Sequence, residues 1–475
     1  MASGVGGDSL ARVLAAARRP HLVGVGGTGM SSLATLLLEM SKSVSGSDSG
    51  SQTTLDWLEQ RGIRIYRRHA AEQVDDADLV ICSAAIPPEN PELATARRRG
   101  LPIVTHAQAL GALMASKHGV AVAGTHGKST TTALIAHILS AAGRDPTLVG
   151  GAEALNFAAS SRLGRGPELV AEADEYGRRF LELRPGIAVI TSIERDHLDY
   201  YRDLDEIVAA FHEFVTRMPI DGLVVSCTDD AVLDRLHLPR RRVRYGFSRQ
   251  ADWRLRSYEL TSAGGCRFLV NSPSGDERAC ELRLPGRHNA ENALAALVVA
   301  DAVGVEARLA DEALATFAGT RRRLETKAQA SGVWVIDDYA HHPSEIRATL
   351  EVARELHQGP IWAVFQPHTA HRTAVLLDEF ATAFDQADHV VLTPVYQPAG
   401  RDTATAQATS ADLAARMVHP DVRVVSSLDE ALVALSPALR EGSLILTLGA
   451  GDIAVLANWL AERAMANAES EPSRG

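Results

Sequence analysis

Short apolar runs alternate with stretches of helical periodicity along most of the chain. Continuous apolar runs bounded by turn residues predict buried strands, and apolar residues at every third or fourth position predict helices. The strand-like runs lie at residues 21–23, 78–82, 102–104, 119–122, 169–171, 187–190, 222–226, 333–336, 361–365, 389–392, 422–425 and 443–447. Strands that alternate with helices predict mostly parallel sheets with helices on both faces.

The alternation falls into three blocks, and a chain of 475 residues is long enough for about three domains. We therefore predict an α/β protein of three domains. Residues 1–117 form a Rossmann-like domain, 118–320 a central domain and 321–475 a second Rossmann-like domain. The central domain is expected to hold a parallel sheet of the P-loop ATPase type with an antiparallel flank at 240–284, where glycine turns separate short β-type runs.

The sequence GTHGKSTTT at residues 124–132 follows an apolar run and precedes a helical stretch. Gly124 and Gly127 let backbone N–H groups converge, Lys128 adds a cation and Ser129 adds a hydroxyl suited to Mg2+. The pattern predicts a site for a nucleotide triphosphate, in a variant shorter than the usual phosphate loop. A strand-to-helix turn without a ligand remains the alternative for this motif alone.

A second glycine turn lies near the N-terminus. Gly24, Gly26 and Gly29 have GxGxxG spacing after a short strand, and Asp48 follows where an acid that binds ribose is expected. This pattern predicts a phosphate-binding Rossmann-like unit.

Acidic residues and His197 follow two strands of the predicted central sheet. The sequence EADE at 172–175 closes one strand, and ERDHLD at 194–199 follows another. Ligands bind at the carboxyl ends of strands in open α/β sheets, and these groups suit Mg2+. The alternative is helix capping by the acids and a hydrogen-bonded core histidine.

Two polar clusters follow strands of the last domain. The sequence DDYAHHP at 337–343 is too polar to be explained by packing alone. Its adjacent histidines would point to opposite sides of an extended chain, so this pair is not expected to bind zinc. The second cluster lies at residues 366–373, after the next strand, and its Arg372 could bind a carboxylate through two hydrogen bonds. On an earlier helix, Asn289 and Asn292 share a face at i,i+3 spacing, which suits the edge of a purine or a simple helix cap.

Composition narrows the classes of function. A hydrophobic content of 46% and a charged content of 23% are typical of a soluble globular protein, and the net charge of −11 argues against a nucleic-acid partner. The cysteines are dispersed without CxxC spacing, and no apolar run is long enough for a membrane span. We expect a cytoplasmic protein without a membrane partner, either a monomer or a weak homodimer.

Together these motifs resemble the Mur ligase family, the cytoplasmic enzymes that add amino acids to the UDP-sugar precursor of peptidoglycan. The resemblance covers nearly the whole chain. Its hallmarks lie at residues 24–30, 44–48, 83–86, 90–92, 124–132, 172–175, 196–199, 288–292, 322–323, 337–343 and 366–373. Residues 201–214 contain no lysine, whereas many sister ligases carry one there, which points to the alanine-adding branch.

The resemblance implies ATP-dependent ligation of L-alanine to the lactyl carboxylate of UDP-N-acetylmuramate through an acyl phosphate. It implies a UDP-sugar site of Gly24, Gly26, Gly27, Thr28, Gly29, Met30, Ser47, Asp48, Ser83 and His126. It implies an ATP site of Gly124, Thr125, His126, Gly127, Lys128, Ser129, Thr130, His288, Asn289, Asn292, Arg323, Asp337 and Asp338. Tyr339, His341 and Arg372 would bind the amino acid, and Ser129, Glu172 and His197 would bind Mg2+. The catalytic residues would be Lys128, Glu172, His197, Arg323 and His341.

Three other functions remain open at this point. A murein peptide ligase would join a recycled tripeptide to the same sugar. A nicotinamide-dependent dehydrogenase would use the N-terminal GxGxxG turn but leaves the second phosphate loop unexplained. A non-catalytic UDP-sugar sensor would have little use for Lys128, Glu172 and His197 together.

Overall fold

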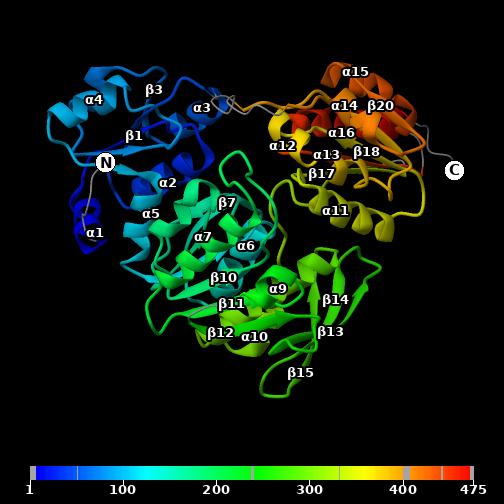
Figure 1. Cartoon of the computed structure of the whole chain (residues 1–475), viewed down its shortest axis with the longest axis horizontal. Helices are drawn as coiled ribbons and strands as arrows, with labels where there is room; N and C mark the ends of the chain where they lie inside the picture. The colour runs from blue at the N-terminus through cyan, green and yellow to red at the C-terminus, as the bar shows by residue number, and fades with distance from the viewer. Residues whose placement is uncertain are drawn as a thin grey trace.

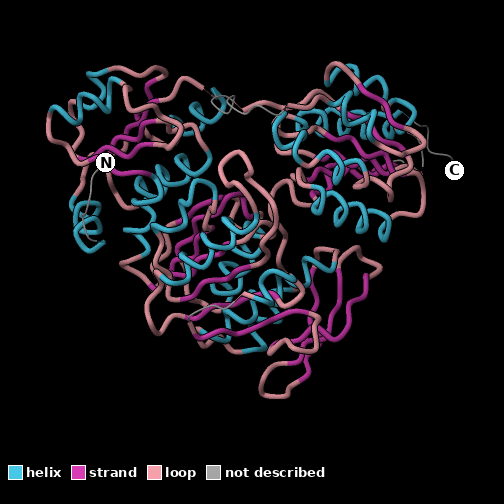
Figure 2. The backbone as a smooth tube through the Cα atoms, viewed as in Figure 1, coloured by secondary structure: helices cyan, strands magenta, loops and turns pink. Residues whose placement is uncertain are grey.

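Three β-sheets flanked by helices follow one another along the chain (Figure 1). The computed structural model describes residues 7–50, 52–236, 240–330, 332–398, 407–439 and 442–470. The first unit (blue) and the last unit (yellow to red) lie on opposite sides above the central unit. In each unit the strands lie between helices (Figure 2). The predicted three-domain α/β fold is confirmed.

The first sheet has five parallel strands in the order β3-β2-β1-β4-β5. Chain order reverses beside β1, so the glycine turn after β1 opens at a crevice of the kind that binds nucleotides. Its strands are β1 (Pro20–Val23), β2 (Ser45–Ser47), β3 (Arg64–Tyr66), β4 (Leu79–Cys82) and β5 (Ile103–Thr105). Its helices are α1 (Gly7–Ala16), α2 (Thr28–Glu39), α3 (Gln52–Gln60), η1 (Ala71–Val74), α4 (Pro91–Arg98) and α5 (His106–Met114).

The central sheet has ten strands in the order β15-β14-β13-β12-β11-β10-β6-β9-β7-β8. Its strands are β6 (His118–Ala123), β7 (Thr147–Ala154), β8 (Ala159–Arg162), β9 (Glu168–Glu172), β10 (Ile187–Ile190), β11 (Leu223–Cys227), β12 (Arg241–Gly246), β13 (Trp253–Leu260), β14 (Cys266–Asn271) and β15 (Glu277–Leu282). Its helices are α6 (Lys128–Ala141), η2 (Tyr176–Glu182), α7 (Leu204–Thr216), α8 (Ala231–Arg235), α9 (Arg287–Ala302) and α10 (Ala307–Leu314).

The predicted antiparallel flank is present, but it begins later than expected. Strand β12 pairs parallel with β11, and the antiparallel pairing of the flank joins β13 to β14 and β14 to β15. The hairpin of β7 and β8 was not predicted, because the glycines at 150–151 interrupt its apolar pattern.

The last sheet has six strands in the order β16-β17-β21-β18-β19-β20, parallel except for the edge strand β16. Its strands are β16 (Glu325–Ala330), β17 (Val333–Asp338), β18 (Ile361–Phe365), β19 (His389–Leu392), β20 (Val422–Val424) and β21 (Leu444–Leu448). Its helices are α11 (Pro343–Leu356), α12 (Ala370–Val375), α13 (Leu377–Ala381), α14 (Ser410–Arg416), α15 (Leu428–Ala434), η3 (Ser436–Ala438) and α16 (Ile453–Ser470). Strand β17 continues two residues beyond the predicted run, because Asp337 and Asp338 pair with Thr447 and Leu448 of β21.

The hydrophobic core is continuous between the first two domains and separate in the last. One buried cluster extends from Leu14 in α1 to Phe317 after α10. The last domain has two clusters of its own, represented by Phe365 and Trp362. Among the described helices, none is long and apolar enough to cross a membrane.

Candidate functional site

The phosphate loop joins the end of β6 to the start of α6 at Lys128. Gly127 precedes the helix with φ 76°, a left-handed conformation that favours glycine. A Cβ atom at Gly127 would lie 2.5 Å from Oδ1 of Asn292, so the position has no room for a side chain. The loop therefore presents the N-terminus of α6 and its N–H groups to a ligand, as an anion site requires.

Lys128 is held at this loop by three oxygen atoms. Its Nζ donates to the carbonyls of Gly124 (2.5 Å) and Thr125 (3.1 Å) and to Oε1 of Glu175 (3.0 Å). Burial alone would lower the pKa of Lys128, but the Glu175 carboxyl raises it. Burial raises the pKa of Glu175 to about 7, with a further contribution from Asp174. Lys128 is therefore a cation in the resting site.

A hydroxyl and a carboxylate meet beside the loop. Ser129 Oγ donates to Oε2 of Glu172 at 2.7 Å, and the N–H of Gly151 donates to the same oxygen at 2.9 Å. A Cβ at Gly151 would approach the Glu172 carboxylate to 2.5 Å, so the close approach of β7 requires glycine. The donor set of a hydroxyl and a carboxylate fits a hard cation such as Mg2+.

His197 lies beside the acid that holds Lys128, with its Nε2 3.7 Å from Oε1 of Glu175 and 3.8 Å from Oδ2 of Asp196. Its backbone has φ 52°, a left-handed conformation that costs of order 1 kcal/mol for a residue with a side chain. Its Nδ1 is buried without a hydrogen-bond partner among the described residues. Burial lowers the pKa of His197, which favours the neutral imidazole that binds metal ions.

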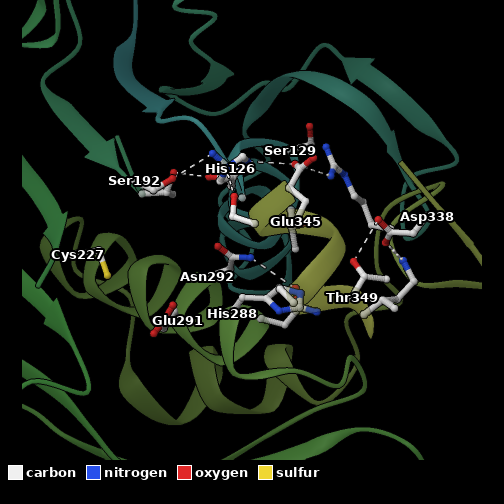
Figure 3. A pocket seen from close by; sticks show the side chains of 18 of the residues that line it. His126, Ser129, Ser192, Cys227, His288, Glu291, Asn292, Asp338, Glu345 and Thr349 are labelled. Carbon is white, nitrogen blue, oxygen red and sulfur yellow. Dashed lines mark hydrogen bonds and ion pairs between the residues drawn. The ribbon is translucent and has the colours of Figure 1, made fainter. Parts of the chain in front are cut away.

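A cavity of about 250 Å³ extends from the phosphate loop along α9 and is closed on one side by the last domain (Figure 3). The residues that the central domain contributes include His126, Gly127, Ser129, Thr130, His288, Asn289 and Asn292. The last domain contributes residues that include Arg323, Asp338, Ser344, Glu345 and Thr349. The structure thus brings together most of the residues that the sequence predicted for ATP, from both domains.

Asn292 and Asn289 already hydrogen-bond within the protein. Asn292 Oδ1 accepts from the Thr131 hydroxyl at 3.1 Å, directly beneath the phosphate loop. Asn289 Nδ2 donates to the carbonyl of Pro285 at 2.7 Å. The pair therefore braces α9 against the loop, and their role at a purine edge stays a prediction.

The two aspartates of β17 differ in their surroundings. Asp338 lines the cavity, and burial raises its pKa to about 6 in spite of Arg323. Asp337 is fully buried, accepts from Arg322 Nε at 2.9 Å and from the Thr447 hydroxyl at 2.7 Å, and is not among the described residues that line the cavity. A role for Asp337 at the nucleotide stays a prediction, whereas its contacts tie β17 to its neighbours.

His126 connects the central domain to the last one. Its Nδ1 lies 3.2 Å from Oε1 of Glu345, and its Nε2 lies 3.0 Å from Ser344 Oγ and 3.5 Å from Oε1 of Glu194. Burial alone would lower the pKa of His126, but Glu345 and Glu194 raise it to about 10. A positively charged His126 therefore joins carboxylates of two domains. His126, Glu194 and His342 also place ligand atoms within 4.8 Å of one another.

Arg372 forms a second bridge between the domains. Its Nε and Nη2 donate to Oδ1 of Asp196 at 3.0 and 2.7 Å, and both side chains are 9% exposed. The other two residues predicted to bind the amino acid lie nearby in the last domain. The ring of Tyr339 is 5.4 Å from that of His341, which is 5.6 Å from the ring of His368, whose Nδ1 is 3.2 Å from Arg372 Nη1.

A larger cavity of about 750 Å³ extends from the glycine turn of the first domain to the central domain. Of the residues predicted to bind the UDP sugar, Gly27, Thr28, Gly29, Met30 and Ser83 line it. Gly24, Gly26, Ser47 and Asp48 are not among its described lining residues, and His126 lines the smaller cavity instead.

Asp48 and Ser47 instead support the glycine turn of the first domain. Asp48 Oδ2 accepts from the N–H of Gly26 at 2.8 Å, and the buried Ser47 hydroxyl donates to Glu92 at 2.8 Å. At the other end of the larger cavity, Glu172 and Tyr339 line its wall. The larger cavity therefore reaches the carboxylate that Ser129 contacts, and Ser129 itself lines the smaller cavity.

Several residues of the site were missed from the sequence. Glu175 and Asp196 were predicted only as members of acidic clusters suited to Mg2+, and no role was predicted for Glu345. Glu345 could have been found, because it is the third residue of α11 and caps His342 in a capping box. The partners of Lys128 and Arg372 lie 47 and 176 residues away in the chain, and no local pattern indicates them.

Comparisons with known proteins agree with this arrangement. Residues 19–118 match the catalytic domain of the Mur ligase family, 122–300 the Mur ligase middle domain and 322–451 the Mur ligase glutamate ligase domain. A UDP-N-acetylmuramate--L-alanine ligase of Anaeromyxobacter sp. is 43% identical over 91% of this chain and 95% of its own length. The corresponding ligase of Acidobacterium capsulatum is 41% identical over 95% of this chain and 98% of its own length.

Solved structures show the same relationship. The UDP-N-acetylmuramate-alanine ligase of Thermotoga maritima has a TM-score of 0.80 and 30% identity, covering 94% of this chain and 99% of its own. A murein peptide ligase of Psychrobacter arcticus has a TM-score of 0.70 and 27% identity, covering 96% and 100%. Since the family models, the relatives and the fold agree over nearly the full length, the chain belongs to the Mur ligase family.

Proposed function

We propose that this chain is an ATP-dependent ligase that joins L-alanine to the lactyl carboxylate of UDP-N-acetylmuramate, giving ADP and phosphate. The observation that carries this function is the identity of 43% over nearly the full length with a ligase of that name. The similarity to a solved alanine ligase, with a TM-score of 0.80, supports it further. The product is a precursor for peptidoglycan synthesis.

We assign one substrate to each domain. Residues 1–117 bind the UDP sugar in the large cavity, 118–320 bind ATP at the phosphate loop, and 321–475 bind the amino acid. The position of Glu172 supports this assignment, because it lines the sugar cavity and accepts from Ser129, which lines the nucleotide cavity. A carboxylate delivered by the sugar would reach the terminal phosphate at this junction.

In the first step, a carboxylate oxygen of the sugar attacks the γ-phosphorus, and the bond to the β-phosphate oxygen breaks to release ADP. Lys128 contributes positive charge where the transferring oxygens gather negative charge. Arg323 is partly buried and lines the smaller cavity, and its electrostatic partners include Glu345, Asp338 and Glu172. Both cations are positioned before the substrate arrives.

In the second step, the neutral amine of alanine attacks the acyl carbon, the bond to the phosphate oxygen breaks, and the nitrogen loses a proton. Tyr339, His341 and Arg372 are the residues assigned to the amino acid. Burial lowers the pKa of His341 to about 4, with Arg372 opposing its protonation, so its imidazole is neutral and available as a proton acceptor. The acyl phosphate would react with water, so the closed contact between the domains protects it.

Mg2+ is the second cofactor that we propose. Ser129 and Glu172 would hold one ion and His197 a second, and the unpartnered Nδ1 of His197 fits such a role. When bound, Mg2+ supplies positive charge to the phosphate oxygens of ATP. We further propose a cytoplasmic monomer or weak homodimer that uses neither nucleic acid nor membrane.

A murein peptide ligase is the second candidate, favoured by the similarity to the enzyme of Psychrobacter arcticus. That enzyme has a TM-score of 0.70, against 0.80 for the alanine ligase, so the murein peptide ligase is the less well supported hypothesis. The dehydrogenase reading has no support among these relatives.

A coupled assay of ADP release tests the proposal. The protein is incubated with ATP, Mg2+ and UDP-N-acetylmuramate, and L-alanine, glycine, L-serine or the tripeptide is added in turn. We expect ADP release to require both the sugar nucleotide and an amino acid, with L-alanine most effective. Release supported by the tripeptide alone would establish the recycling ligase, and consumption of NADH without ADP release would refute both.

A further inference from the structure

Two histidines from different domains meet beside the phosphate loop. His126 lies in that loop, His342 is the N-cap residue of α11, and their ring centres are 4.9 Å apart. Glu194, which follows β10, completes a cluster in which one ligand atom from each side chain lies within 4.8 Å of the others. The neighbouring His341 is not part of it, and its Nδ1 lies 2.9 Å from the carbonyl oxygen of Tyr339. Across the described ranges, this is the one cluster of three or more such groups.

The second nitrogen of each histidine already has a partner outside the cluster. Nδ1 of His126 lies 3.2 Å from Oε1 of Glu345 (Figure 3). Nε2 of His342 lies 3.1 Å from the carbonyl oxygen of Arg195, which can only accept, so this nitrogen carries a proton. Histidines that bind metal ions have this arrangement, in which a carboxylate or a carbonyl holds one nitrogen and orients the other toward the ion.

The hydroxyl of Ser344 lies at the centre of the cluster. Its Oγ is 3.0 Å from Nε2 of His126, 2.7 Å from Nδ1 of His342 and 2.8 Å from Oε2 of Glu194. Nε2 of His126 is 3.5 Å from Oε1 of Glu194, and Nδ1 of His342 is 3.7 Å from Oε2. A tetrahedral zinc ion with ligands at about 2.1 Å spaces the ligand atoms by roughly 3.4 Å. These separations differ from that spacing by less than about 1 Å, so small movements would place the four groups around one ion.

The charges and the donor atoms of the cluster suit zinc. Glu345 and Glu194 are paired with a positively charged His126 in the free protein. A zinc ion would displace the proton on Nε2 of His126 and place its own two positive charges near the same carboxylates. Two imidazole nitrogens and a carboxylate form a donor set typical of zinc, whereas magnesium prefers oxygen ligands alone.

We propose that His126, Glu194 and His342 bind one zinc ion between the central domain and the last one. Ser344 supplies the fourth ligand atom. The central domain contributes one nitrogen and one carboxylate, and the last domain contributes the other nitrogen, so the ion would hold the two domains together. It would also lie at the wall of the smaller cavity, which His126, Glu194 and Ser344 line. This inference does not depend on the proposed ligase function.

Zinc titration of the full chain without an affinity tag and without nucleotide tests the inference. A chromophoric chelator competes for the zinc, and excess Mg2+ fills sites that prefer a hard cation. His342→Asn removes a ligand of the last domain but keeps a residue suited to an N-cap, and Glu194→Gln removes a ligand of the central domain. His389→Asn is the matched control, because His389 lies 2.6 Å from Asp421 but belongs to no such cluster in the part of the chain that the structure describes.

We expect the parent to take one equivalent of zinc from the chelator. His342→Asn and Glu194→Gln should each weaken zinc binding by tenfold or more, because losing even a partner that only orients a ligand costs about 10–100-fold. His389→Asn should stay within twofold of the parent, and circular dichroism checks that each variant is folded. A parent that takes up no zinc would overturn the inference. So would a folded variant of either domain that binds zinc as tightly as the parent, since the ion would then not join the two domains.

Discussion

The buried pair of Asp196 and Arg372 should hold the last domain against the central one. At 2.7 Å and an effective dielectric constant of about 20, the attraction between the two charges is about 6 kcal/mol before desolvation. Removing one partner leaves the other charge buried and costs about 3–5 kcal/mol. We therefore expect Asp196→Ala or Arg372→Ala to shift the ratio of closed to open molecules by about 150-fold or more toward the open form.

A double-mutant cycle measures this coupling in the free protein. Dyes on Ile220→Cys and Val418→Cys, which are 85% and 97% exposed in the parent, report the separation of the domains by energy transfer. A Cys82→Ser background removes the one cysteine of the chain that is not buried. The two single substitutions should together cost more than the double substitution by about 2–4 kcal/mol.

Arg195 and Glu379 supply the matched control for the cycle. They pair across the same interface at 3.3 Å, but their side chains are 51% and 42% exposed. Their coupling should stay below about 1 kcal/mol because solvent screens the charges. Additive effects of Asp196→Ala and Arg372→Ala, within about 0.5 kcal/mol, would refute the reasoning.

Three further predictions concern the central domain. Lys128→Met should lower ADP formation by at least about 100-fold with the fold intact by circular dichroism, and retention of a tenth of the activity would contradict its role at the transferring phosphate. Ser129→Ala should raise the Mg2+ concentration for half-maximal activity several-fold, whereas Ser129→Thr, which keeps the hydroxyl, should leave it unchanged. Because the folded pKa of Glu291 lies at about 7, above its unfolded value near 4.5, the parent should lose up to about 3 kcal/mol of stability as pH rises between these values. Glu291→Gln should remove this loss, so thermal melting should match the parent at pH 5 and exceed it at pH 8, and equal melting at both pH values would be evidence against the raised pKa.

The sequence located the elements that carry the site better than the contacts within it. Glycine spacing and polar residues after apolar strands placed Lys128, Glu172 and His197 at strand ends, and parallel pairing of β6, β9 and β10 brings those ends together. These predictions succeeded because strand ends of one parallel sheet share an edge. The periodicity of apolar residues and the spacing of glycines are local properties of the chain, so they predict individual helices, strands and turns.

The partners of these side chains depend on packing between distant segments. Arg372 was expected to meet a substrate carboxylate, yet in the free protein it meets Asp196, which lies 176 residues earlier in the chain. The role of Asn292 at a base stays a prediction, whereas its contact with the phosphate loop, where Gly127 packs on its side chain, was not foreseen.

The division of the hydrophobic core has a mechanical consequence. The first two domains share one buried cluster, so separating them would expose apolar surface. The last domain keeps its own clusters and meets the central one through groups such as Arg372, His126 and Ser344. Water can replace those contacts as they part, so swinging the last domain away sacrifices little apolar burial. The first two domains thus form one packed body, and a movement of the last domain would open the cavity at the phosphate loop, because that domain supplies one of its walls.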